Sequence, residues 1–193
     1  IIGGDIVDTS GVGTYTVTYN VTDSNRNIAV EVTRIVIVQD LTSPVITLTG
    51  DEIVYVEYEG IYLEQGATFT DNYDLEGDAI VGGDTVDTSI LGTYTLTYSV
   101  TDTSSNEAIE VTRIVIVEDT TLPVISLNGD AIVYVEYTDI YNELGATFTD
   151  NYDLDGDAII SGDSVDTSIL GAYTITYNMT DTNSNMALEV IRT

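Results

Sequence analysis

The sequence contains no cysteine, histidine, lysine or tryptophan, and each absence removes a class of chemistry. Without cysteine there is no disulfide framework, and without histidine or cysteine the ligands that zinc prefers are missing. No histidine base can activate a serine, no thiol can act as a nucleophile, and no lysine can form a Schiff base. Carboxylate pairs remain, but they fall in turns and recur with a repeat, so we expect a protein that is not an enzyme.

Long apolar segments are also missing. No stretch approaches the roughly eighteen consecutive apolar residues of a transmembrane helix, and no signal peptide opens the sequence. We therefore expect no membrane insertion in this window, and we expect any secretion signal to lie outside it.

Positive charge is scarce, because 33 acidic residues stand against four arginines and give a formal charge of −29. Such a field repels nucleic acid and anionic lipid and attracts cations, so nucleic acid is not an expected partner. High net charge also favours disorder, but 43% of the residues are hydrophobic, which is enough to build a core. The sequence therefore predicts a folded acidic protein.

A single period runs through the whole chain. Asp5, Asp84 and Asp163 share a Gly-Asp context, and 84 − 5 and 163 − 84 both equal 79. A fixed period of this size predicts a tandem array of small domains, and its phase suggests a window cut from a longer chain. The expected domains are the C-terminal half of a repeat (1–40), a complete repeat (41–119) and a repeat lacking its last strand (120–193).

The complete repeat has the pattern of short strands. Residues 94–101, "YTLTYSVT", alternate apolar with small polar side chains, as a half-buried strand does, and no segment shows helical periodicity. Many short strands separated by Gly, Asn and Asp within about eighty residues indicate an immunoglobulin-type sandwich. We therefore predict an all-β fold of tandem immunoglobulin-like antiparallel β-sandwiches. Further strands are expected in "PVITL", "IVYVEY", "GATFTD", "DAIVG" and "EVTRIVIV".

The segment "LGTYTL" predicts a tyrosine corner. In this motif Tyr94 at the entry of a strand turns its hydroxyl back onto the preceding loop, and Leu96 points into the core. The same pattern recurs as "VGTYTV" and "LGAYTI". An ordinary core tyrosine is the alternative.

Three segments of the complete repeat carry a family resemblance, namely "PVITLTGDEIVYVEY", "GATFTDNYD" and "VDTSILGTYTLTYSVTDTSSNEAIEVTRIVIV". Through them residues 44–117 as a whole resemble the bacterial Ig-like repeat family that is named after a domain of a pesticidal crystal protein. The loops "TDN-x-D" and "TD-x-x-x-N" are also similar, more distantly, to hyalin-type repeats. The resemblance implies tandem extracellular modules of large secreted or cell-surface bacterial proteins, used as spacers or adhesin parts, and it implies no ligand.

Acidic residues are concentrated in loops that the predicted fold brings together. "TDNYDLEGD" at residues 70–78 returns as "TDNYDLDGD" at 149–157 and joins the second and third strands of a sandwich. That loop, the loop before the last strand and the incoming linker share one end of an Ig-like domain. We therefore predict two cation sites at domain junctions. Their candidate ligands are Asp40, Asp71, Asn72, Asp74 and Asp102 at the first junction, and Asp119, Asp150, Asn151, Asp153 and Asp181 at the second.

Calcium suits these candidates because it takes six to eight oxygen ligands without demanding a rigid geometry. The segment "NYDLDG" partly matches an EF-hand loop, but Gly162 falls where a bidentate Glu is required, so an EF-hand is rejected. Metal-free loops remain the alternative, because Asp and Asn also build turns by bonding to their own backbone.

The expected function is that of a non-enzymatic extracellular structural repeat, which forms an extended rod, stalk or filament with calcium-stiffened junctions. The linkers "VQDLTSPV" and "VEDTTLPV" are short and contain proline, which resists bending. The expected partners are neighbouring repeats of the same chain, and self-assembly into a fibre through exposed strand edges is a further hypothesis. A carbohydrate- or cell-binding adhesin module with a glycan or cell-surface target is the alternative, since fourteen tyrosines could supply stacking faces. Sequons at Asn20 and Asn178 could carry glycans.

Overall fold

The computed structural model describes residues 1–193, and all of its sixteen regular elements are strands. The chain forms no helix with the length and apolar composition that a membrane crossing requires. The first repeat, residues 1–40, contains one antiparallel sheet in the order β1-β2-β3. Its strands are β1 (Ile2–Gly4), β2 (Gly13–Tyr19) and β3 (Val32–Val38).

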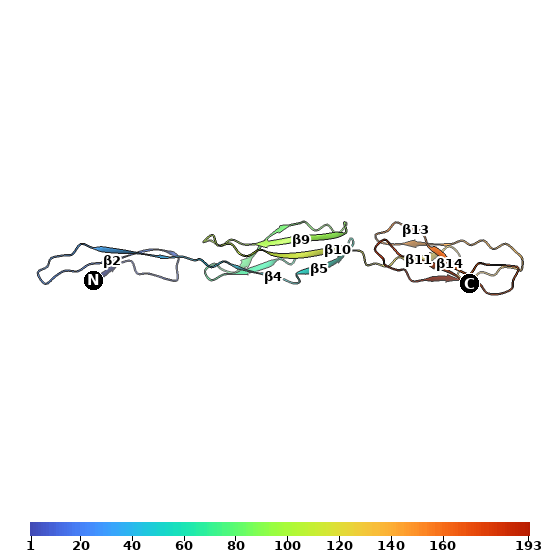
Figure 1. Cartoon of the computed structure of the whole chain (residues 1–193), viewed down its shortest axis with the longest axis horizontal. Helices are drawn as coiled ribbons and strands as arrows, with labels where there is room; N and C mark the ends of the chain where they lie inside the picture. The colour runs from blue at the N-terminus through green and yellow to red at the C-terminus, as the bar shows by residue number, and fades with distance from the viewer. The chain divides into compact units, whose positions relative to one another are not determined.

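The middle repeat, residues 41–119, contains two sheets. One has the order β4-β6-β7 and the other the order β5-β10-β9-β8, in which β5, β10 and β9 lie side by side (Figure 1). The β5–β10 pair is parallel, which the alternating pattern did not predict, while the β4–β6, β6–β7 and β8–β9 pairs are antiparallel. The strands are β4 (Val45–Leu48), β5 (Ile53–Glu57), β6 (Ala67–Thr70), β7 (Gly77–Asp78), β8 (Ile80–Gly83), β9 (Gly92–Ser99) and β10 (Val111–Glu118).

The third repeat, residues 120–193, contains two antiparallel three-stranded sheets, in the orders β11-β12-β13 and β14-β15-β16. It repeats the pairing of the middle repeat, since Val124 pairs with Thr149 as Val45 pairs with Thr70. The strands are β11 (Val124–Leu127), β12 (Ala146–Thr149), β13 (Gly156–Asp157), β14 (Ile159–Gly162), β15 (Ile175–Asn178) and β16 (Val190–Arg192).

The chain forms two compact units whose bounds pass through the middle repeat. Unit 1 comprises residues 1–52, 64–83 and 96–113, and unit 2 comprises residues 53–63, 84–95 and 114–193. The domain bounds expected from the 79-residue period therefore remain predictions.

Each unit has an apolar core built from the inward side of the alternating strands. Unit 1 buries Leu96 and Tyr98 of β9, and unit 2 buries Phe148 of β12 with Ile175 and Tyr177 of β15. Leu96 and Tyr98 are two residues apart along their strand, and so are Ile175 and Tyr177, as the period-two pattern requires. The fold class predicted from the sequence is confirmed.

The tyrosine corner is present in all three copies. The Tyr94 hydroxyl donates to the carbonyl oxygens of Asp87 at 2.8 Å and Ile90 at 3.0 Å, while Leu96 is 4% exposed. Tyr15 and Tyr173 make the same bonds to their own loops. The corner fastens the loop before the strand to the strand itself.

A buried arginine anchors each of the two later repeats. Arg113 is 1% exposed and donates to the carboxylate of Glu64, to the Tyr98 hydroxyl and to the carbonyls of Thr49 and Asp51. It lies on the same face of its strand as the buried Val115 and Val117, and this alternation is the sequence signal for its burial.

The third repeat contains the same network, centred on Arg192 and Glu143. Arg192 is 2% exposed and donates to Glu143, Tyr177 and the carbonyls of Asn128 and Asp130. Burial by itself would raise the pKa of Glu143, but hydrogen bonds from Tyr141, Tyr177 and the Gly145 amide, together with Arg192, lower that pKa to about 2.

We predict that Tyr94→Phe lowers the free energy of unfolding by about 1–2 kcal/mol, because two carbonyl oxygens lose their donor. Urea denaturation of the variant and the wild-type chain measures the difference. An unchanged midpoint would show that water replaces the hydroxyl without loss.

We predict that Glu143 makes the third repeat sensitive to acid. Because its pKa in the folded state, about 2, lies below the unfolded value of 4.5, its stabilisation is complete above about pH 5 and is lost as the pH falls toward 2. The stability difference between the wild type and Glu143→Gln should therefore shrink by on the order of 2–3 kcal/mol between pH 5 and pH 2. Denaturant melts at both pH values test this, and a constant difference would contradict it.

Candidate metal centre

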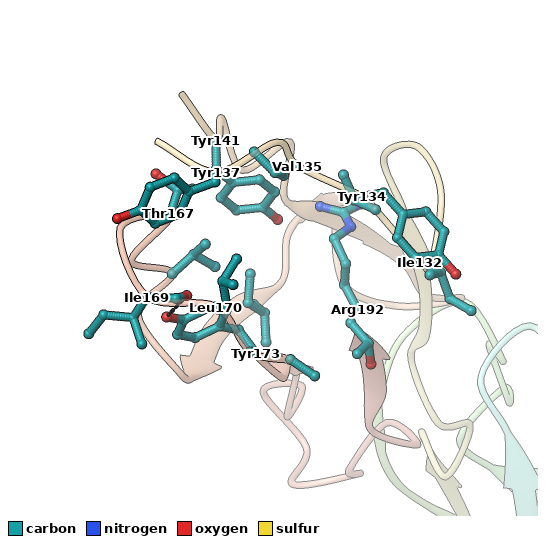
Figure 2. Close-up of a pocket in the computed structure, with 16 residues that line it drawn as sticks. Ile132, Tyr134, Val135, Tyr137, Tyr141, Thr167, Ile169, Leu170, Tyr173 and Arg192 are labelled. Carbon is teal, nitrogen blue, oxygen red and sulfur yellow. Dashed lines mark hydrogen bonds between the residues drawn. The ribbon is translucent and has the colours of Figure 1, made fainter. Parts of the chain in front are cut away.

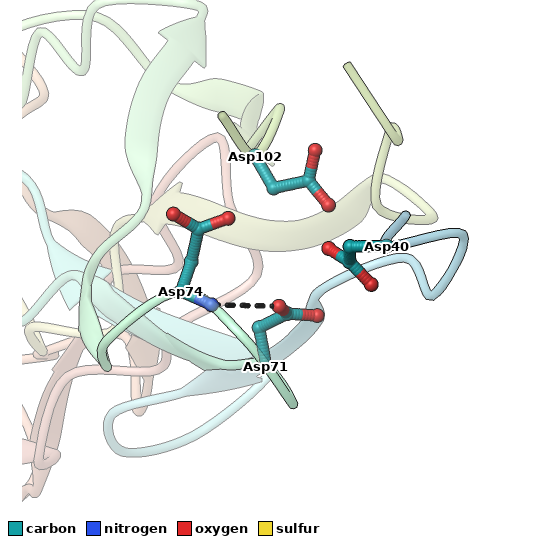
Figure 3. Close-up of side chains that lie close together, drawn as sticks. All are labelled: Asp40, Asp71, Asp74 and Asp102. Carbon is teal, nitrogen blue, oxygen red and sulfur yellow. Dashed lines mark hydrogen bonds between the residues drawn. The ribbon is translucent and has the colours of Figure 1, made fainter. Parts of the chain in front are cut away.

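Four aspartates from three separate segments form the first carboxylate cluster. Asp40 lies between β3 and β4, Asp71 and Asp74 follow β6, and Asp102 follows β9. One carboxylate oxygen of each lies within 4.8 Å of those of the other three, and Figure 3 shows the four side chains turned toward a common centre. The loops predicted to converge at one end of the repeat do so.

The acidic loop after β6 is shaped by its own first aspartate. Asp71 Oδ2 accepts hydrogen bonds from the backbone amides of Tyr73 at 2.9 Å and Asp74 at 3.0 Å. These bonds lower the pKa of Asp71. Asp74 in turn accepts bonds from the Thr103 amide at 3.1 Å and hydroxyl at 2.8 Å, which tie the acidic loop to the loop after β9.

Asn106 closes the loop that carries Asp102, and it also reaches the linker. Its amide nitrogen donates to Asp102 Oδ1 at 2.7 Å, and its side chain donates to Asp102 Oδ2 at 2.8 Å and to the Asp40 carbonyl at 3.3 Å. Burial raises the pKa of Asp102, but the bonds from Asn106 outweigh it, so the net shift is downward. The motif "TD-x-x-x-N" therefore attaches the linker to the loop.

Asp40 is the carboxylate of the first cluster with the least solvent. It is 7% exposed; its Oδ1 accepts a bond from the Thr42 amide at 3.1 Å, and its buried Oδ2 has no hydrogen-bond partner. The Asn72 side chain lies beside it and, in the orientation that satisfies the amide, donates to Asp40 Oδ1 at 3.1 Å. A buried anionic oxygen without a partner is costly, and this cost favours a cation.

The second carboxylate cluster consists of Asp119, Asp150 and Asp181, again within 4.8 Å of one another. Asp119 is 5% exposed, and two buried oxygens, Asp119 Oδ2 and Asp150 Oδ1, have no hydrogen-bond partner. Burial raises the pKa of Asp119, against a bond from the Thr121 amide, and the charges of Asp150, Asp181 and Glu57 raise it further. Asn185 repeats the role of Asn106 by joining Asp181 to the Asp119 carbonyl at 3.1 Å.

The other two predicted ligands of the second junction make hydrogen bonds of their own. Asp153 accepts bonds from the Thr182 amide at 2.8 Å and hydroxyl at 2.9 Å and does not join the three carboxylates. The Asn151 side chain donates to Glu57 at 3.0 Å. Glu57 was not among the predicted residues, because its strand context "VYVEY" carries no signal for this contact.

Both clusters offer only oxygen atoms, which matches the ligand preference of calcium and magnesium and not that of zinc. Like charges at such distances repel by about 1 kcal/mol per pair in a watery setting and by more where the carboxylates are buried. The arrangement can therefore hold a hard divalent cation, and the metal-free chain retains this repulsion.

An apolar cavity lies elsewhere, in unit 2. It has a volume of about 390 Å³ and is lined in part by Tyr137 and Arg192 (Figure 2). Its wall at residues 132–135 matches β5 of the middle repeat, where Ile114–Glu118 pair with Ile53–Glu57. In the middle repeat, β10 pairs with the segment equivalent to this wall. The cavity therefore gives no independent argument for a sugar site.

In comparison with known proteins, one family model matches both later repeats. The family model described as bacterial surface protein, Ig-like domain, matches residues 46–117 and again residues 125–193. No curated protein matches the chain.

We predict that Asp119→Asn raises the melting temperature of the chain in the presence of a chelator. The folded-state pKa of Asp119 is raised, so its ionised form is destabilising at neutral pH, and the neutral amide removes an unpartnered buried charge. A gain of about 1 kcal/mol is expected. Thermal melts in chelator measure it, and a lower melting temperature would contradict the prediction.

Proposed function

Because the chain belongs to the family of bacterial surface protein Ig-like domains, we propose that it is a structural spacer of a large cell-surface protein, with calcium-stiffened junctions between its repeats. The family match covers most of the chain in two tandem copies. Domains of this family are surface structural or adhesion modules and are generally not enzymes.

The observation that carries the proposal is the buried, unpartnered carboxylate oxygen in the linker before each of the two later repeats. Asp40 Oδ2 and Asp119 Oδ2 occupy equivalent positions one period apart, and each lies among aspartates of two other loops. The donor set fits a hard divalent cation, since all the available atoms are carboxylate oxygens. Bound calcium would neutralise the mutual repulsion of the aspartates that hold it.

Stiffening follows from where the ligands originate. Asp40 and Asp119 are linker residues, while Asp71, Asp102 and their equivalents belong to the body of the next repeat. A cation held by both fixes the linker to the loops of that repeat. Short proline-containing linkers act in the same direction, so the proposed calcium-loaded array is an extended rod whose partners are its own adjoining repeats.

We predict that calcium stabilises the chain through both clusters. With a dissociation constant of about 10⁻⁴ M, as in extracellular modules, about 2 mM calcium contributes roughly 2 kcal/mol per site. This corresponds to a rise in melting temperature of several degrees. Differential scanning calorimetry with calcium and with chelator gives the comparison.

The matched control is the double variant Asp40→Asn, Asp119→Asn, in which the calcium-dependent rise should disappear. Tyr94→Phe, which lies outside both clusters, should retain it. If sodium chloride at matched ionic strength produces the same rise, general screening of the −29 charge explains the effect and the calcium proposal fails. Small-angle scattering that shows no change in dimensions with calcium would contradict the stiffening.

A further inference from the structure

Glu57, the last residue of β5, contacts the residues that flank the second carboxylate cluster. Its carboxylate accepts bonds from the Thr120 hydroxyl at 2.6 Å, the Thr121 hydroxyl at 2.9 Å and the Asn151 side chain at 3.0 Å. The Thr120 amide also donates to both oxygens. The Glu136 side chain is exposed, and its carboxylate accepts a bond from the Tyr137 amide.

The residues that Glu57 holds are the immediate neighbours of the second carboxylate cluster. Thr120 and Thr121 follow Asp119 in the chain, and Asn151 follows Asp150. The Thr121 amide also donates to Asp119 Oδ1 at 3.2 Å. Asp119 and Asp150 carry the two unpartnered buried oxygens of that cluster, so Glu57 acts on the segments that present them.

A ring contact reinforces the same attachment. Tyr58, the next residue after Glu57, meets Tyr152 edge-on with ring centroids 5.0 Å apart, and Tyr152 lies two residues after Asp150. The bonds from Thr120, Asn151 and Thr121 outweigh burial and lower the pKa of Glu57 to about 2, so Glu57 is ionised at neutral pH. The end of β5 thus binds both segments at once.

We propose that Glu57 is a positioning residue for a divalent cation at the second carboxylate cluster, and that it couples occupancy of this site to attachment of the middle repeat. The inference rests on the proposed function, because it requires calcium to bind there. By linkage, a contact that orders the cation ligands raises cation affinity, and the bound cation strengthens the contact equally. Residues that orient metal ligands in this way typically change affinity by 10–100-fold when altered.

The test is calcium titration calorimetry on the 193-residue chain. The background variant Asp40→Asn, Asp71→Asn removes binding at the first cluster, so that the remaining site is the second. In this background Glu57→Gln should weaken calcium binding roughly tenfold. The matched control Glu136→Gln, which alters the equivalent position without these contacts, should leave the affinity unchanged.

Glu57→Asp separates positioning from simple attraction, because it keeps the charge and shortens the reach of the carboxylate. Positioning predicts that Glu57→Asp also weakens calcium binding, and wild-type affinity in this variant would overturn the proposal. Equal losses in Glu57→Gln and Glu136→Gln would overturn it as well. If the background chain binds calcium and Glu57→Gln leaves its affinity unchanged, the role of Glu57 fails and the proposed function stands. Absence of calcium binding in the wild-type chain overturns both.

Discussion

Two of the four arginines in this protein are buried inside its sandwiches, so they cannot compensate the negative charge of the loop aspartates. Arg113 and Arg192 bind Glu64 and Glu143, two tyrosine hydroxyls and four backbone carbonyls. Each joins residues that are up to 64 positions apart in sequence, which makes the arginine a central tie of its repeat. Loss of one partner from a buried ion pair is strongly destabilising, so these arginines must remain paired in the core.

The burial of these arginines affects the aspartates of the two carboxylate clusters. With half of the positive charge enclosed, the aspartates of the two carboxylate clusters have no side-chain cation beside them, and their hydrogen bonds come from amides and hydroxyls. Those bonds satisfy Asp102 and Asp181, but they leave one oxygen each on Asp40, Asp119 and Asp150 buried without a partner. An external cation is the simplest way to compensate them.

The two clusters also differ in a way that the repeat hides. The first gathers four carboxylates and the second three, because Asp153 lies outside its group although it makes the same threonine bonds as Asp74. Glu57 is attached to the neighbours of two aspartates of the second cluster. The two clusters thus offer different sets of carboxylates to a cation.

The sequence by itself determined the strands, the tyrosine corner and the convergence of Asp40, Asp71, Asp74 and Asp102. Alternation and turn residues are local signals, and the 79-residue period shows how these signals are grouped into domains. It did not reveal the parallel β5–β10 pair, the enclosure of Arg113 by Glu64 and Tyr98, or the contact of Glu57 with Asn151. Those features depend on which distant segments meet. Local patterns specify each strand and turn, and only tertiary packing decides which distant side chains and strands become partners.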